Sequence, residues 1–285
     1  KAGKKESAGC VRADPGMDTS LYPETCIAAP GGGSTTGARC FYTHVPSAVV
    51  SAKAADSTLK LPLVIDMHGG GGCAHHRMQN SGFKELADSL AAADPATSFV
   101  AVWPQGYDTG WGTCGSDCAA AQREQDDAKS GKTVQSTDDL TFLAGLVAYL
   151  AKSTEDVNPA KSLIDAERVF STGFSMGCMM SHRLALEKSA ILAGFGCHGG
   201  RMIQLGEDVA AEKKRFDVQP MPAYMTGGSE DGWFADSTKD LNDWATINGC
   251  DATVPATSTA LNLTATGGEK SSSESATMTV RSVGC

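Results

Sequence analysis

The residues with the clearest chemical potential are 173–177, which read G-F-S-M-G and place Ser175 between two glycines. The residues before them, 168–172, are typical of a short buried strand, and residues 179–186 after them are typical of a helix. A serine on a sharp turn between a strand and a helix has an exposed hydroxyl, and the small neighbours avoid clashes in that turn. We therefore predict that Ser175 is a nucleophile. The alternative is a glycine-rich turn with an incidental serine.

A second glycine-rich loop could stabilise the negative charge that such a serine creates. Residues 61–67 form an apolar, strand-like run that ends in His68 and four glycines. Backbone amides in such a loop can donate to a tetrahedral oxyanion, and each donor contributes about 3 kcal/mol in the transition state. One expected donor is the amide of Met176. The other is expected among three glycines, namely Gly69, Gly70 and Gly71. No Lys-Ser/Thr pair follows, as a phosphate-binding P-loop would require.

An acid is expected after the nucleophile. Asp231 follows a strand-like run at residues 220–226, and functional residues gather at the carboxyl ends of strands in an open α/β sheet. Its position fits the chain order nucleophile, acid, histidine, with Glu230 as the weaker candidate. That order requires a histidine after Asp231, and the sequence has none there.

All six histidines precede Asp231, namely His44, His68, His75, His76, His182 and His198. We expect each of them to be a neutral imidazole with ordinary hydrogen bonds rather than the base of a triad. His68 in particular is expected to shape the glycine loop.

The chain resembles the secreted polyhydroxybutyrate depolymerase and feruloyl/acetylxylan esterase family of α/β-hydrolases. The resemblance covers roughly residues 40 to 250 and rests on four ordered blocks, 61–72, 99–114, 136–143 and 168–177. It implies a secreted serine esterase that hydrolyses carboxylic esters of a biopolymer through an acyl-enzyme, without a cofactor or metal. The implied substrates are polyhydroxyalkanoate or feruloyl and acetyl groups on polysaccharide. Ser175, the oxyanion loop and Asp231 carry over position by position.

In such esterases the catalytic histidine lies in a loop after a terminal strand. Residues 276–285 alternate apolar and polar side chains like a strand, and the sequence stops where the last strand and the histidine loop would begin. Two interpretations stay open. The sequence is cut short of a fuller protein, which we favour, or the protein is a non-catalytic hydrolase-like domain that serves binding or extracellular structure.

Alternating strand-like and helical runs predict a mostly parallel sheet covered on both faces. The strands are expected near residues 61–67, 98–103, 167–172, 191–196, 221–226 and 276–283, and the helices near 77–93, 137–153, 176–189 and 234–248. We expect one α/β-hydrolase domain over residues 41–285, lacking its last strand and histidine loop. A disulfide-stapled N-terminal extension is expected over residues 1–40.

Trp111 and Trp233 lie in loops expected at the active face. Either ring could bind substrate by stacking on a sugar or aryl group, and a lid or packing role is the open alternative. Ser136 and Asp139 have the spacing of a helix-capping pair, which accounts for Asp139 without a catalytic role.

Ten cysteines in 285 residues, with no C-x-x-C pair, indicate disulfides and an extracellular location rather than a metal site. We predict a disulfide between Cys250 and Cys285. Asn262 begins an N-x-T sequence, which predicts glycosylation on a surface loop. The net charge of -9 argues against nucleic acid as a partner, and no apolar run approaches the ~20 residues of a membrane helix. The expected partner is a polymeric or oligomeric ester.

Overall fold

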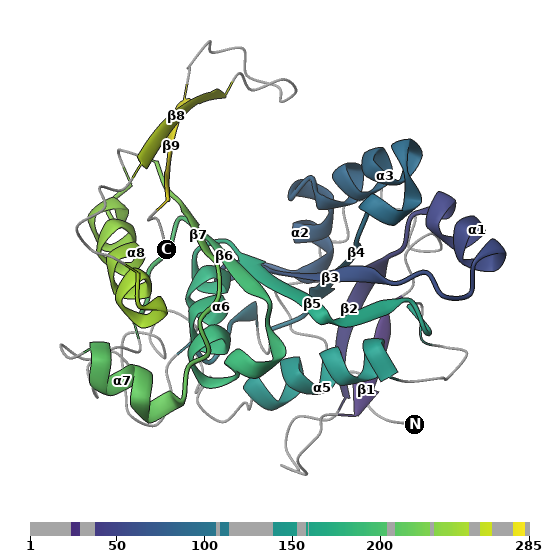
Figure 1. The fold of residues 1–285 in the computed structure, drawn as a ribbon, viewed down its shortest axis with the longest axis horizontal. Coiled ribbons are helices and arrows are strands. Elements are labelled where there is room, and N and C mark those ends of the chain that lie inside the picture. Colours follow the sequence, from purple (N-terminus) through teal and green to yellow (C-terminus); the bar gives the residue numbers. More distant parts are fainter. Residues whose placement is uncertain are drawn as a thin grey trace.

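The computed structural model describes residues 24–28, 38–106, 109–113, 139–152, 158, 160–203, 209–228, 231–250, 257–263 and 276–282. A seven-stranded sheet with the strand order β1-β2-β4-β3-β5-β6-β7 forms the centre of the protein (Figure 1). Strands β3 to β7 run parallel to one another, and β1 and β2 are antiparallel additions at one edge. The predicted α/β architecture is therefore confirmed.

The strands of this sheet are β1 Thr25–Ala28, β2 Ala38–His44, β3 Leu61–Met67, β4 Val100–Pro104, β5 Ile164–Gly173, β6 Gly194–His198 and β7 Ala223–Thr226. Two further strands, β8 Thr257–Leu263 and β9 Ala276–Ser282, form a separate antiparallel hairpin, and β9 lies beside β7. The helices are α1 Ser47–Ala55, α2 Ala74–Asn80, α3 Phe83–Ala93, α5 Asp139–Lys152, α6 Met176–Glu187, α7 Val209–Phe216 and α8 Phe234–Asn248. None of these helices is long and apolar enough to cross a membrane.

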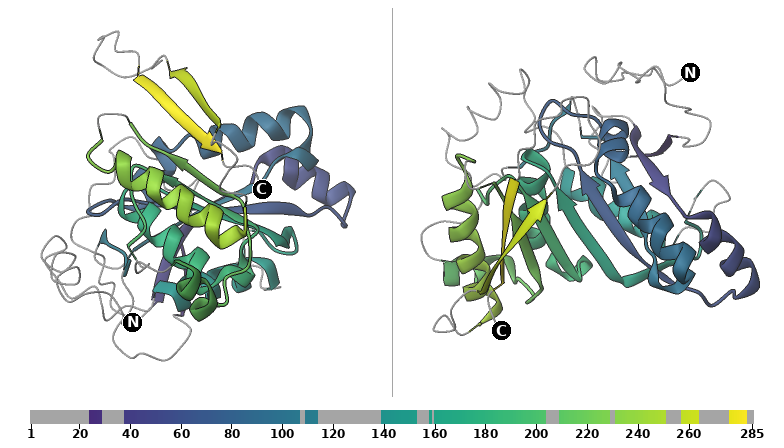
Figure 2. Two further views of the ribbon diagram at one scale, coloured as in Figure 1. Left: turned by 60° about the vertical axis from the view of Figure 1, so that its left-hand side comes forward. Right: turned by 90° about the horizontal axis from the view of Figure 1, so that it is seen from above.

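Alternating side chains on the strands build two apolar layers, one on each face of the sheet. In β3, Leu63 and Ile65 are fully buried in the larger core, and that face of β5 and β6 packs against α6. Val64 points the other way and packs with the smaller core beneath α2 and α3 (Figures 1 and 2). Parallel strands covered in this way read as near-continuous apolar runs, which is why β3 and β4 were recognisable in the sequence.

The register of β3 and β5 brings the two glycine-rich segments together. Met67 pairs with Gly173 at the carboxyl ends of these neighbouring strands. The glycine loop after β3 and the turn that contains Ser175 therefore leave the sheet side by side. A single pairing register thus assembles residues that lie about a hundred positions apart in the chain.

Several elements differ from the sequence-based expectation. The helix predicted over 77–93 is two helices, because Gly82 adopts φ 74° and ends the regular repeat between α2 and α3. β1 falls within the expected N-terminal extension, yet it pairs with β2 of the main sheet. The Cys26–Cys40 disulfide joins these two strands, at positions that face each other in the register.

Other disulfide and loop predictions lie partly outside the described residues. Cys250 is disulfide-bonded, but its predicted partner Cys285 is not among the described residues. Asn262 lies in β8, and the threonine that completes its N-x-T sequence falls outside. Glu230 and Ser136 also fall outside.

Candidate active site

Ser175 occupies a strained turn between β5 and α6. Its backbone has φ 53° and ψ -115°, a region that non-glycine residues rarely adopt. Such a conformation costs about 1–3 kcal/mol and persists only where the surroundings enforce it, most often at functional sites. The Ser175 amide donates a hydrogen bond of 2.9 Å to the carbonyl oxygen of His198, which ends the neighbouring strand β6. The turn is therefore fixed to the sheet on that side.

Both glycines of the G-F-S-M-G segment are required by close backbone contacts. A Cβ atom on Gly173 would lie 2.4 Å from the carbonyl carbon of Gly177. A Cβ atom on Gly177 would lie 2.2 Å from the carbonyl oxygen of Met67 and 2.7 Å from that of His68. Helix α6 can approach the end of β3 this closely only without side chains at these positions, so the two glycines let Ser175 stand at the edge of the sheet.

The glycine loop lies directly beside the nucleophile. A Cβ atom on Gly69 would lie 3.4 Å from the Cβ of Ser175, and one on Gly70 would lie 3.2 Å from the Cε of Met176. The amide of Gly71 donates to the carbonyl of Thr109 at 2.8 Å, so it is already used. Within the described part of the chain, the amides of Gly69, Gly70 and Met176 have no acceptor. Because Gly70 lies against Met176 itself, the N–H groups of these two residues are the neighbouring pair that is free to donate to an oxyanion at Ser175.

His68 holds the glycine loop in shape. Its side chain is buried, its Nδ1 donates to the carbonyl of Gly69 at 2.8 Å, and its Nε2 accepts from the amide of Gly106 at 2.9 Å. Burial lowers the pKa of His68 to about 4, so the ring is neutral at physiological pH. With both nitrogens engaged, His68 is a structural residue of the loop and has no free nitrogen for Ser175.

Trp111 supports the same loop from beneath. Only 1% of it is exposed, its indole Nε1 donates to the carbonyl of His68 at 2.8 Å, and its amide donates to the Sδ of Met176 at 3.3 Å. Of the two roles left open for Trp111, the structure shows packing in the interior and not stacking on a substrate. Trp111 contacts both the oxyanion loop and the residue after the nucleophile.

Asp139 is a residue of the site that sequence reasoning assigned only to helix capping. Its carboxylate is fully buried at the start of α5, with Oδ1 accepting from Arg39 and Oδ2 accepting from the amide of Gly112, both at 2.6 Å. It therefore ties the Trp111 loop to β2. Nothing local in the sequence could indicate this contact, because Arg39 precedes Asp139 by a hundred residues.

Asp231 follows β7, at the carboxyl end of the parallel strands, where the turn with Ser175 also lies. Its amide donates to the carbonyl of Gly228 at 3.0 Å, and its Oδ1 accepts from the amide of Trp233 at 3.0 Å. A Cβ atom on Gly199 would lie 3.5 Å from its other carboxylate oxygen, so the carboxylate lies beside the turn after β6. Trp233 is half-buried, and the guanidinium of Arg201 lies 5.9 Å from the centre of its ring.

The six histidines all lie in the described part of the chain, and none of them is hydrogen-bonded to the hydroxyl of Ser175 there. His198 is the exposed histidine beside the turn, but its Nδ1 lies 2.5 Å from the hydroxyl of Thr226 and its ring lies 5.5 Å from that of Phe174. Partial desolvation of the ring and the positive charge of Arg77 lower the pKa of His198, and the negative charge of Asp231 opposes that effect. We therefore identify none of the six histidines as the catalytic base.

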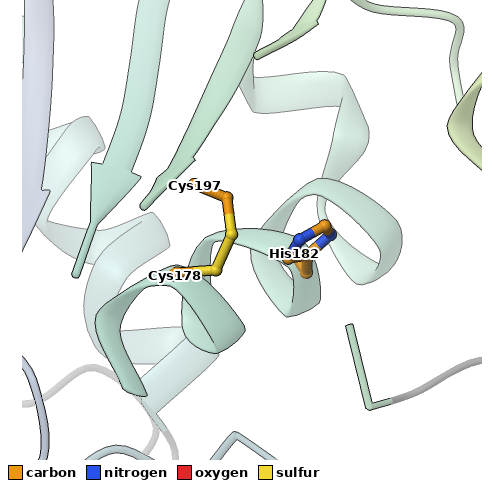
Figure 3. A group of neighbouring side chains, drawn as sticks. All are labelled: Cys178, His182 and Cys197. Atoms are coloured by element: carbon orange, nitrogen blue, oxygen red, sulfur yellow. A yellow bond between two sulfur atoms is a disulfide. The ribbon is translucent and has the colours of Figure 1, made fainter. Parts of the chain in front are cut away.

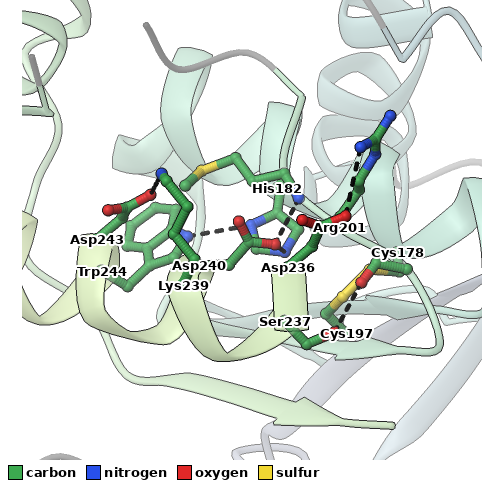
Figure 4. A network of polar contacts seen from close by, with 12 residues as sticks. Cys178, His182, Cys197, Arg201, Asp236, Ser237, Lys239, Asp240, Asp243 and Trp244 are labelled. Atoms are coloured by element: carbon green, nitrogen blue, oxygen red, sulfur yellow. Dashed lines mark hydrogen bonds and ion pairs between the residues drawn. A yellow bond between two sulfur atoms is a disulfide. The ribbon is translucent and has the colours of Figure 1, made fainter. Parts of the chain in front are cut away.

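A buried polar network holds α6 against α8 (Figure 4). The indole of Trp244 donates to Nδ1 of the fully buried His182 at 3.0 Å, and Nε2 of His182 lies 3.9 Å from a carboxylate oxygen of Asp240. Burial raises the pKa of Asp240 to about 7, although its hydrogen bond from the amide of Met202 opposes the shift. The helix after the nucleophile is thereby packed against the helix that follows the Asp231 loop.

Solved structures with this fold are similar to the chain over most of its length. An acetyl xylan esterase from Aspergillus awamori is 14% identical, with a TM-score of 0.54 and coverage of 83% of this chain and 84% of that one. FphF, a fluorophosphonate-binding serine hydrolase of Staphylococcus aureus, is 12% identical, with a TM-score of 0.53 and coverage of 80% and 86%. The feruloyl esterase module from Clostridium thermocellum, in complex with sinapinate, is 17% identical, with a TM-score of 0.50 and coverage of 81% and 75%.

No protein-family model and no curated protein matches the chain. At these low identities the similarity to solved structures concerns the fold. Together with the mostly parallel sheet and the turn at Ser175, it shows that the protein has the α/β-hydrolase fold.

The contact at Gly177 generates a first prediction. Gly177→Ala should lower the free energy of unfolding by about 3 kcal/mol, because overpacking against two carbonyl oxygens forces α6 away from β3. The matched control is Gly228→Ala, where a Cβ would meet no atom within 4 Å, and its effect should stay within about 0.5 kcal/mol. Urea denaturation measures both. Equal stability of the two variants would contradict the packing argument.

The raised pKa of Asp240 generates a second prediction. The folded state holds this proton up to about pH 7, whereas the unfolded state releases it near 3.8, so the contribution of Asp240 to stability falls as the pH rises between these values. Asp240→Asn has no proton to lose. Relative to the wild type, its free energy of unfolding should therefore increase by more than about 1 kcal/mol between pH 4.5 and pH 7.5. The free energies of unfolding are measured by urea denaturation. If they change with pH in the same way for the two proteins, the pKa of Asp240 is not raised.

Proposed function

We propose that the protein is a secreted serine esterase that hydrolyses carboxylic esters through an acyl-enzyme on Ser175. The observation that carries the proposal is the strained turn at Ser175 beside two amides, those of Gly70 and Met176, that have no acceptor within the described residues. A glycine-rich turn with an incidental serine would need neither the strain nor the unused donors.

In the proposed reaction the hydroxyl oxygen of Ser175 attacks the ester carbonyl carbon and forms a new C–O bond. The carbonyl oxygen becomes an oxyanion that accepts hydrogen bonds from the amides of Gly70 and Met176. Collapse of this intermediate breaks the ester bond, and the alcohol leaves with a proton. Water then attacks the acyl-enzyme in the same way and releases the acid. The reaction needs no redox step.

The proton of Ser175 must pass to a general base, and we assign this role to a histidine oriented by Asp231. Asp231 lies in the loop that follows β7, after the nucleophile in the chain, as this order of residues requires. None of the six histidines lies in the position that the base requires. Ser175 and Asp231 are therefore the two identified members of the proposed triad, and the base is not identified.

The lack of a histidine in the position of the base favours the second candidate function, a hydrolase-like domain that binds an ester without cleaving it. Such a protein would have lost its base and retained the fold for binding or for extracellular structure. Against it stands the combined retention of the strain at Ser175 and of the free amides, which a binding domain does not need. Chemical reactivity of Ser175 separates the two functions.

The proposed substrate class is an ester of a biopolymer, namely polyhydroxyalkanoate or a feruloyl or acetyl group on polysaccharide. The similarity to an acetyl xylan esterase and to a feruloyl esterase module supports this class. Phe174, directly before the nucleophile, is 44% exposed, and Trp233 lies two residues after the proposed acid, so both rings could contact such a substrate. The disulfides support secretion.

Reaction with a fluorophosphonate probe tests the proposal. The protein from its native source should form one covalent adduct, mapped to Ser175 by mass spectrometry, because an activated serine attacks phosphorus as it attacks an ester carbonyl. Ser175→Ala should abolish the adduct, whereas Ser57→Ala, an exposed serine distant in sequence, should retain it. A folded protein that forms no adduct would refute the esterase function and favour the binding domain.

The pH dependence of ester hydrolysis tests the proposed histidine base. With a base of pKa about 6.5, kcat/KM for a small soluble ester should fall about tenfold per unit below that pH. Protonation of the oxyanion loop would not explain such a fall, because the pKa of His68 is lowered to about 4. A flat profile between pH 5 and pH 8 would exclude a histidine with an ordinary pKa.

A further inference from the structure

A disulfide joins the two segments that meet at the nucleophile. Cys178 lies in the first turn of α6, three residues after Ser175, and Cys197 lies in β6, directly before His198. Their Cα atoms are 4.5 Å apart (Figure 3). The disulfide therefore lies beside the backbone hydrogen bond from Ser175 to His198 and joins the same two segments covalently.

The surroundings of this disulfide belong to the strained turn itself. A Cβ atom on Gly200 would lie 2.6 Å from the Sγ of Cys178 and 2.7 Å from the carbonyl oxygen of Ser175, so the chain after β6 closes directly over both. His182, one turn further along α6, has a ring nitrogen within 4.8 Å of the two sulfur atoms (Figure 3). Because the sulfurs are bonded to each other, they carry no thiolate charge, and their chemistry is that of a crosslink.

A strained backbone turn relaxes if one of its two anchors can move. One anchor of Ser175 is the glycine contact of α6 with β3, and the other is the hydrogen bond to β6. The hydrogen bond alone permits α6 to shift along β6, whereas the disulfide fixes the first turn of the helix to that strand. Displacements near 1 Å at a nucleophile reduce rates by roughly 10²-fold, so this constraint matters for chemistry as well as for stability.

Burial distinguishes this disulfide from the one at the edge of the sheet. Cys178 and Cys197 are 0% and 3% exposed, whereas Cys26 is exposed and Cys40 is half-buried. A reductant in solvent can reach the edge disulfide, but not the buried one while the protein is folded. The buried bond is therefore a permanent constraint and not a switch.

We infer that the Cys178–Cys197 disulfide positions the nucleophile, holding Ser175 in its reactive conformation beside the amides of Gly70 and Met176. This inference rests on the proposed esterase function. It assigns Cys178 and Cys197 as positioning residues, since neither contacts the reacting atoms. The edge disulfide Cys26–Cys40 joins two strands remote from Ser175 in the sheet order and has no such role.

The test compares two double variants of the full chain, each lacking one disulfide. Cys178→Ala with Cys197→Val keeps apolar side chains in a helix and a strand that favour them. Cys26→Ala with Cys40→Ala is the matched control. The rate constant of fluorophosphonate labelling at Ser175 and kcat for a soluble ester should fall 10- to 100-fold in the first variant, with KM changed less than about threefold. The control should label at the wild-type rate.

Urea denaturation must show both variants folded under assay conditions, so that loss of reactivity is not loss of fold. A folded first variant that labels as fast as the wild type would overturn the inference and leave the esterase proposal intact. If the wild type itself is not labelled, the esterase proposal fails, and hydrogen exchange of residues 173–180 decides the inference. Faster exchange there in the first variant than in the control supports the positioning role, and equal exchange refutes it.

Discussion

The site depends on one steric constraint, the contact of α6 with the backbone at the end of β3. Gly177 lies against the carbonyl oxygens of Met67 and His68 at a distance that excludes any side chain. This contact sets the turn at Ser175, brings the amide of Met176 next to the glycine loop, and fixes the face of α6 that packs on the sheet. The remaining interactions of the site hold these positions once the two backbones have met.

Most of that arrangement could be predicted because it is encoded locally. The glycines around Ser175 and those after His68 indicate that two backbone segments approach each other closely. The apolar runs before these glycines predict the strands. The pairing of Met67 with Gly173 then follows from the parallel sheet. What the sequence could not reveal depends on distant partners. Trp111 lies in a loop, as the sequence predicts, but only its contact with the carbonyl of His68 shows that the ring faces inward.

The edge strands and the helix break escaped prediction for different physical reasons. β1 and β2 are paired through backbone hydrogen bonds and a disulfide. Neither kind of contact produces a repeating pattern of apolar residues in the sequence. The break at Gly82 is one residue with a positive φ inside a pattern that otherwise continues as a helix. The missing histidine, in contrast, was evident before the structure, because the sequence has no histidine after Asp231. The fold is consistent with that observation, since no imidazole in the described part of the chain is hydrogen-bonded to Ser175.

The carboxylate of Asp139 has a consequence for the order in which the protein is made. It accepts hydrogen bonds from Arg39, which precedes it by 100 residues, and from the amide of Gly112, which precedes it by 27 residues, so both donors are synthesised before it. During synthesis, the guanidinium and the Trp111 loop lack this carboxylate until α5 begins to form. Contacts of such long sequence separation are completed late in folding. The loop of Trp111, which contacts the oxyanion loop at His68, therefore gains this support only after the first half of the protein has been synthesised.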